Sequence, residues 1–231
     1  LILIDVVFLS VVNKILTNLE SKGIIFDKLE AFIKKFYTNE LIKGVILFIG
    51  LGLLYLIFTL LIEYFLWLST TGRTVLFWLF VAVEAFLLIR FIAFPLFKLF
   101  KLQKGINYEE ASQIIGNHFS EVNDKLKNFL QLSNDTNQSE LLLASIDQKA
   151  QTLNPSPFGN AVNFKGNVKY LPWAIIPILF FAFFMISGNS DVITQSFNRV
   201  VRYNERFSPP APFAFVVTNP SLQTEQGNDF V

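Results

Sequence analysis

Long apolar runs alternate with polar stretches along this chain, and three of the runs are long enough to cross a lipid bilayer. They cover Gly44–Leu68, Thr74–Phe97 and Tyr170–Ser187. A helix needs about 20 mostly apolar residues to span the hydrocarbon core. The polar loop between the first two runs, Ser69–Arg73, is short. These two spans are therefore predicted to form a helical hairpin within residues 44–104, and residues 170–188 to form a third transmembrane helix.

The N-terminal segment, residues 1–43, is predicted to contain an interfacial amphipathic helix. Asp27 and Glu30 match a capping box at the start of Asp27–Ile42, where apolar residues occupy one face and lysines the other. We expect this helix to lie on the inner leaflet; docking on a helical domain is the alternative. Leu1–Val12 is apolar but too short to cross. It is a remnant of a longer span, a surface helix or a mis-assigned start.

Residues 105–169 are predicted to form a small antiparallel helical domain. Asn107 and Glu110 form a second capping pattern before one long helix. Ser139 caps another helix, whose apolar stripe includes Leu142, Ile146, Ala150 and Leu153. Such stripes must pack on each other, on the N-terminal helix or on a partner. In the long helix that follows Asn107, the apolar residues that recur at helical spacing are Ile115, Phe119, Val122, Leu126 and Phe129.

The last segment, residues 189–231, combines helical and extended patterns. Ile193, Phe197, Val200 and Val201 predict a short amphipathic helix. A Pro-rich linker follows, and then apolar residues alternate from Phe213 onward. This alternation predicts the first strands of an immunoglobulin-like β-domain. The expected fold class is thus a mainly α membrane protein with three transmembrane helices, a helical insertion and the start of a β-domain.

Composition and charge agree with a membrane protein and suggest its orientation. Hydrophobic residues make up 52% of the chain and charged residues 16%, against roughly 25% charged in soluble domains. A net charge of +1 gives no indication of a nucleic-acid partner. Lysines flank the ends of the spans that face residues 1–43 and 105–169, whereas the hairpin loop has only Arg73. The positive-inside rule therefore places the helical domain in the cytoplasm and the C-terminal part in the periplasm of a bacterial inner membrane. Arg199, Arg202 and Arg206 depart mildly from that rule.

Few residues are suited to catalysis or to metal binding. Cysteine is absent and His118 is the single histidine, which excludes thiolate chemistry and multi-histidine metal sites. His118 has no evident base or orienting partner, which is typical of a surface helix residue. We therefore expect no enzyme activity, no cofactor and no small-molecule substrate. The start at Leu1, with Met185 as the only methionine, predicts a fragment or a processed product.

Three charged residues lie within the apolar runs and are the candidate site residues. Glu84 lies near the middle of the second run, Arg90 nearer its cytoplasmic end, and Glu63 toward the outer end of the first. Charges at such depths usually face protein or water. Glu84 and Arg90 are separated by about 120° around a helix, so they are not expected to pair with each other. We expect partners on a neighbouring span, a further helix or a second subunit, with Gly50 and Gly52 allowing close helix contact.

The block "KLQKGINYEEASQIIGNHFSEVNDKLKNFLQL", followed by "SELLLASIDQKAQTL", resembles the N-terminal region of DUF4175, a bacterial inner-membrane family of unknown function, here of the Bacteroidetes type. The resemblance covers roughly residues 26–230 and implies a large periplasmic region. It implies no activity and no functional residues. The expected function is an anchor or scaffold that contacts the lipid bilayer and binds protein partners or itself. A subunit of a transporter or energy-coupled envelope machine and a transmembrane signal relay are the alternatives.

Overall fold

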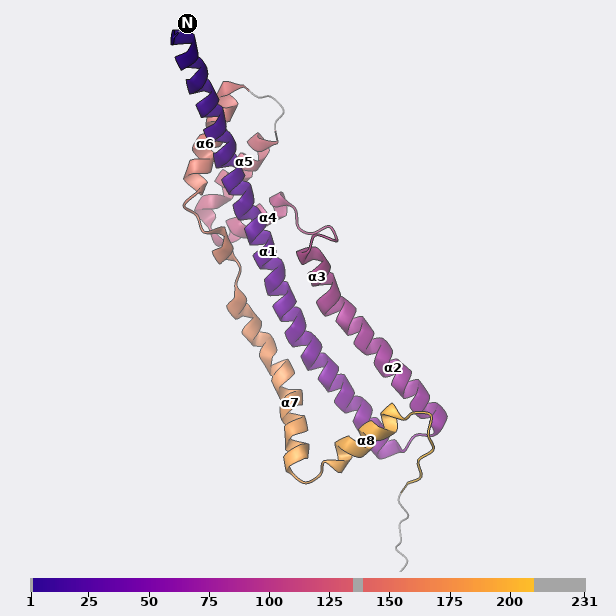
Figure 1. The fold of residues 1–231 in the computed structure, drawn as a ribbon. Coiled ribbons are helices and arrows are strands. Elements are labelled where there is room, and N and C mark those ends of the chain that lie inside the picture. The colour runs from indigo at the N-terminus through magenta and orange to yellow at the C-terminus, as the bar shows by residue number, and fades with distance from the viewer. Residues whose placement is uncertain (1, 135–138, 210–231) are drawn as a thin grey trace, which may run out of the picture.

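The computed structural model describes residues 2–134 and 139–209, which are mainly helical and contain no strand (Figure 1). The predicted β-strands from Phe213 onward lie outside the described residues. Helices α1, α2 and α3 form the hairpin, α4 to α6 form a compact unit at one end, and α7 returns to the other end, where α8 lies across the hairpin. The bounds are α1 Ile2–Leu66, α2 Thr70–Leu88, the π-helical η1 Ile89–Ala93, α3 Phe94–Leu99, α4 Tyr108–His118, α5 Ser120–Ser133, α6 Glu140–Leu153, the 3-10 turns η2 Phe158–Ala161 and η3 Phe164–Tyr170, α7 Leu171–Ile186 and α8 Asp191–Val201.

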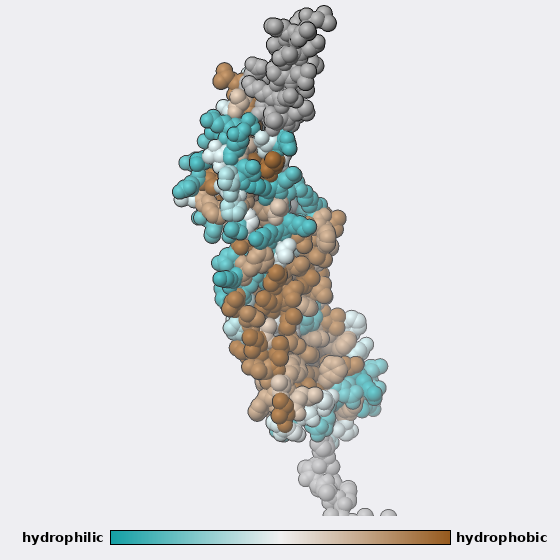
Figure 2. Space-filling model, turned by 60° about the vertical axis from the view of Figure 1, so that its left-hand side comes forward, coloured by the Kyte–Doolittle hydropathy of each residue, from teal (hydrophilic) through white to brown (hydrophobic). Residues whose placement is uncertain are grey.

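The prediction of membrane spans is confirmed, because three stretches are long and apolar enough to cross a membrane. They are Glu20–Leu66, Thr70–Leu99 and Phe158–Ile186. Their apolar side chains form a band between two polar ends (Figure 2). We call this band the apolar belt, and its two limits the helical-domain end and the α8 end. The loop of the hairpin is shorter than predicted, since Ser69 already caps α2 and Arg73 lies in its first turn.

Helix α1 is one unbroken helix, and this corrects the prediction of a separate interfacial helix at Asp27–Ile42. At about 1.5 Å per residue, 65 residues extend roughly 100 Å, far more than a bilayer requires. No proline interrupts the helix, and Asp27 and Glu30 lie in its interior rather than at a cap. The N-terminal stretch, including the described part of Leu1–Val12, therefore continues directly into the first span.

The apolar stripe that was predicted to lie on lipid instead packs against protein. Leu29 and Phe32 are fully buried, and Ile33 and Phe36 pack against the same cluster. The alternative of docking on the helical domain is thus the one observed, because α4 to α6 cannot bury their own stripes without a further helix. The buried cluster consists of Ile25, Leu29, Phe32, Ala111, Ile115, Val122, Leu126, Phe129, Leu130, Ile146, Ala150, Leu153, Phe158 and Val162.

Two lysines of α1 fix the C-terminal ends of the helices that dock on it. Lys22 Nζ donates a hydrogen bond to the carbonyl oxygen of Ser133 at 3.0 Å, at the end of α5. Lys28 Nζ donates to the carbonyl oxygen of Asn154, directly after α6. Cations are favourable where a helix leaves carbonyl groups unpaired. These lysines therefore serve the helical domain and not the lipid surface.

The single long helix predicted from Tyr108 is divided into α4 and α5 by a sharp bend at Phe119. Phe119 has φ −119° and ψ 88°, which ends the helical path while its side chain still packs on the buried cluster. The close return of α5 on α4 depends on Gly116, because a Cβ there would collide with the side chain of Asn123. The predicted caps are confirmed, with a full capping box at Asn107 and a hydrogen bond from Leu142 N–H to Ser139 Oγ of 3.3 Å.

Glycines of α1 mark the points where the other spans approach its backbone. At Gly44, a Cβ would overlap the carbonyl oxygen of Phe91 in η1. The Phe91 carbonyl accepts no helical hydrogen bond from residue 95, four positions later, because that residue is a proline and has no N–H. At Gly50, a Cβ would lie 2.6 Å from the carbonyl oxygen of Trp173 at the start of α7. The predicted role of Gly50 in close helix contact is confirmed.

Candidate functional site

Glu63 lies at the centre of a buried ion cluster at the α8 end. Its side chain is fully buried, as are those of Arg73 and Arg199, which are 1% and 4% exposed. The Nε atom of Arg73 and the Nε atom of Arg199 each donate a hydrogen bond of 3.1 Å to Glu63 Oε1. The sequence pattern placed Glu63 toward the outer end of the first span, and there the structure joins it to two arginines from separate segments. We call Glu63, Arg73 and Arg199 the arginine–glutamate cluster.

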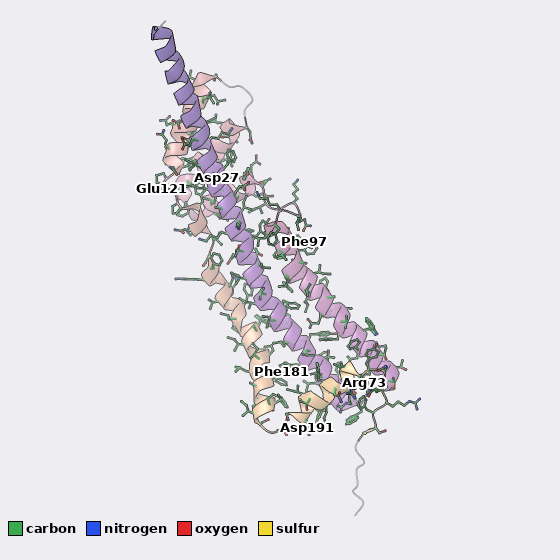
Figure 3. The ribbon with its side chains drawn as sticks, viewed as in Figure 1. Asp27, Arg73, Phe97, Glu121, Phe181 and Asp191 are labelled. Atoms are coloured by element: carbon green, nitrogen blue, oxygen red, sulfur yellow. The ribbon has the colours of Figure 1, made fainter. Side chains whose placement is uncertain are left out.

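Arg73 connects the hairpin turn with the segment after α8. Its Nη2 donates to the carbonyl oxygen of Leu68 and its Nη1 to that of Glu205, both at 2.9 Å. Its guanidinium also lies over the ring of Phe207, 5.0 Å from the ring centroid. An arginine in the first turn of a helix opposes the helix dipole. The neighbouring Glu63 carboxylate offsets this charge, and Figure 3 shows Arg73 between the hairpin turn and α8.

Arg199 fixes α8 itself to the end of α1. Its guanidinium lies 4.0 Å from the centroid of the Trp67 ring, and its Nη2 donates to Ser196 Oγ at 3.3 Å. Trp67 has a positive φ of 44°, a conformation that costs roughly 1–2 kcal/mol for a residue with a Cβ. The stacking on Arg199 holds the Trp67 ring in this position. The ends of α1 and α8 are therefore joined by an ion pair and by a cation–π contact.

The face that α8 buries differs from the face predicted by its apolar residues. The helix is present at Asp191–Val201, but Ser196, Arg199 and Val200 are buried while Phe197 and Val201 are about half exposed. The ion pair with Glu63 sets this rotation, because a fully buried carboxylate must be paired. Phe197 and Val201 face outward at the edge of the apolar belt. Just beyond the helix, the ring of Tyr203 stacks on Phe77 of α2 with centroids 4.6 Å apart.

The other two candidate residues lie apart from this cluster. Glu84 is half-buried, lies near the middle of the candidate span Thr70–Leu99 and faces α1, where a Cβ on Gly52 would lie 2.9 Å from Glu84 Oε2. Glu84 Oε1 is buried and accepts no hydrogen bond from the described residues. Arg90 lies in η1 and is exposed. Within the described residues no ion pair joins Glu84 to Arg90, in agreement with their spacing. Glu84 instead contacts a neighbouring span, α1.

The residues considered for other chemistry do not converge. His118 is exposed at the end of α4, with its ring against the edge of Phe119 at 4.6 Å between centroids. In residues 2–134 and 139–209, no three His, Asp or Glu side chains are grouped so that they could hold a metal ion. The arrangement at the α8 end is suited to holding segments together, since arginine forks bind carboxylates and carbonyls at fixed angles.

Arg73 and Arg199 were not among the residues selected from the sequence. The signal for Arg73 was available, because it is the single basic residue between two apolar runs and follows Glu63 by ten positions. Arg199 lies 136 positions from Glu63, so no local pattern relates the two. No protein-family model, curated protein or solved structure matches this chain. The resemblance to DUF4175 stays a prediction.

Proposed function

We propose that this chain is a bacterial inner-membrane anchor, which fixes the segment after α8 at the outer surface of the membrane and presents it to partner proteins. The observation that carries this proposal is the pairing of Glu63 with both Arg73 and Arg199. A buried carboxylate that binds the hairpin turn and α8 together restrains the chain where it leaves the third span. Such a restraint suits an anchor for the segment that continues from α8.

The distribution of charge supports the proposed orientation. Two of the arginines that depart from the positive-inside rule have an acidic partner: Arg199 shares Glu63 with Arg73, and Arg202 pairs with Glu205 at 3.6 Å. Lysines gather at the helical-domain end of the apolar belt, where Lys98, Lys101 and Lys104 follow the hairpin. An excess of lysine and arginine near the ends of the spans is what retains a loop in the cytoplasm. The proposed orientation therefore has α4 to α6 in the cytoplasm and α8 in the periplasm.

Cysteine labelling in intact bacterial cells tests the proposal, because the chain has no cysteine of its own. We choose the exposed positions Thr71, Asp191 and Asn128 for single substitutions to cysteine. We expect a membrane-impermeant maleimide to label the Thr71→Cys and Asp191→Cys variants in intact cells, and the Asn128→Cys variant only after lysis. Labelling of all three to the same extent, or in the reverse pattern, would show that the anchor proposal is wrong. The parent chain without cysteine is the control.

Glu84 supports one second candidate, a subunit of a transporter or energy-coupled envelope machine. A carboxyl oxygen that is buried in the middle of the apolar belt, with no hydrogen-bond donor among the described residues, costs free energy. Carboxyl groups at such positions often take part in proton transfer. The Glu84→Gln variant separates the two candidates. An anchor should keep its membrane level, its complexes and the cellular phenotype. If assembly is unchanged and a proton-dependent phenotype is lost, the anchor proposal gives way to the second candidate.

A further inference from the structure

A cavity of about 600 Å³ opens at the helical-domain end, between α1 and the turn that follows α3. The turn forms because α3 ends in a left-handed residue, Lys101, with φ 57°. The N–H groups of Leu102 and Gln103 then both donate to the carbonyl oxygen of Phe97, at 2.8 and 3.3 Å. This is a Schellman-type helix end. It turns the chain back toward α1, where the N–H of Ile106 donates to the Tyr37 hydroxyl at 2.7 Å.

The cavity is strongly basic. Lys34, Lys98, Lys101 and Lys104 line it, and Glu30 is the one acidic residue of the lining, which gives a net charge of +3. Glu30 is already engaged: Lys101 Nζ donates to its Oε2 at 2.8 Å and the Tyr108 hydroxyl donates to its Oε1 at 2.9 Å. The hydrogen bond to Glu30 raises the pKa of Lys101, which keeps that ammonium charged. Within the described residues, Lys34, Lys98 and Lys104 form no ion pair.

The other part of the lining is apolar and continuous with the apolar belt. Ile33, Leu99 and Leu102 contribute to the cavity wall. The neighbouring Phe97 is labelled at the end of the hairpin in Figure 3, and Phe97, Phe100 and Leu102 are 45%, 66% and 74% exposed. The candidate span of the hairpin ends at Leu99, so Lys98, Lys101 and Lys104 stand at its limit. A ligand here meets charge on one side and hydrocarbon on the other.

We propose that this cavity binds the phosphate headgroup of an anionic phospholipid, whose acyl chains lie along α3 in the bilayer. Basic pockets beside membrane helices attract such headgroups through charge at close range. Lysine acts as a point charge and not as a shaped fork, so the site should select for negative charge and not for one headgroup structure. Phosphatidylglycerol and cardiolipin should therefore both bind, and phosphatidylethanolamine should not. The proposal depends on the membrane spans and is independent of the anchor function.

The test is the lipid retained by the purified protein. The full chain is placed in nanodiscs of phosphatidylglycerol and phosphatidylethanolamine, then released and analysed by native mass spectrometry. We expect bound phosphatidylglycerol to exceed phosphatidylethanolamine, and the excess to fall about tenfold in the Lys98→Gln/Lys104→Gln double variant. The Lys98→Arg/Lys104→Arg variant should retain the excess of phosphatidylglycerol, because it keeps both positive charges. An unchanged melting temperature in phosphatidylcholine nanodiscs shows that the double variant is folded.

A matched control removes two other exposed lysines near the membrane, in the Lys165→Gln/Lys169→Gln variant. Its phosphatidylglycerol excess should equal that of the parent. Equal retention of both lipids by the parent, or equal losses in the two Gln variants, overturns the proposal. Retention of inorganic phosphate with no excess of either lipid also overturns it, because the ligand is then a soluble phosphate compound and not a lipid.

Discussion

Replacing Glu63 with Gln should release α8 from the hairpin. The substitution keeps the shape of the side chain but removes the charge that two buried guanidinium groups share. Loss of one partner from a buried ion pair typically destabilises by about 3–5 kcal/mol, because the remaining charge stays buried without compensation. Since α8 lies at the edge of the molecule, most of this loss should appear as local undocking. Hydrogen exchange of the α8 amides measures it directly, and these amides should exchange much faster than in the parent.

The cluster also predicts an order among its members. Arg199→Met should destabilise the whole chain less than Glu63→Gln, because Glu63 then still pairs with Arg73 and no charge of the cluster is left buried without a partner. Glu205→Gln is the matched control, since Glu205 is about half exposed and, among the described residues, its carboxylate pairs only with the exposed Arg202. Exposed pairs contribute little, typically below about 1 kcal/mol. Protected α8 amides in the Glu63→Gln variant, or faster exchange in the Glu205→Gln variant, would contradict this account of the cluster.

Adding a single methyl group at Gly44 or Gly50 should separate the spans. The new Cβ would meet backbone atoms, the carbonyl oxygen of Phe91 in one case and that of Trp173 in the other. Neither can move as a flexible side chain would, so helix α1 must shift against its neighbours. Overpacking of this kind typically destabilises by about 1–3 kcal/mol, occasionally more. We expect Gly44→Ala and Gly50→Ala to lower the melting temperature in detergent micelles. The measurement is the fraction of protein that remains monodisperse after heating to a series of temperatures.

Gly23 gives a control of opposite sign in the same helix. A Cβ at Gly23 meets nothing within 4 Å. Glycine in a helix interior is less favourable than alanine by roughly 0.5–1 kcal/mol, because it loses more backbone freedom on folding. Gly23→Ala should therefore raise the melting temperature slightly. If all three alanine variants raise the melting temperature, helix propensity and not close packing controls these sites.

The local pattern of residues was sufficient to predict the membrane spans and the helix caps. Twenty or more apolar residues in series admit few structures in a bilayer, and Asn107 and Ser139 satisfy helix N–H groups a few positions away. The bend at Phe119 was missed because its apolar side chain fits the helical period, whereas the close approach of α5 to α4 beyond the bend places Asn123 against Gly116. The continuity of α1 was missed because Asp27 and Glu30 match a capping box that a helix interior also tolerates.

The candidate site depends on contacts between distant segments, which a pattern of neighbours does not contain. Phe197 and Val201 belong to the apolar stripe of α8, yet the helix turns Arg199 inward because the buried Glu63 carboxylate lies there and requires positive charge. For Glu63, depth in the membrane was the available signal, and depth alone identifies a charge that needs a partner without naming it. The partner is set by the tertiary fold.

The unbroken helix α1 connects the candidate span rigidly to the helical domain. No joint separates its membrane part from the part that carries the helical domain, so the two must tilt together. Leu29, at the centre of the domain core, lies roughly 22 Å beyond Gly44 at about 1.5 Å per residue. A tilt of about 10°, within the range by which helices adapt to bilayer thickness, displaces that core sideways by about 4 Å. Any change in the tilt of α1 would therefore move the helical domain with it.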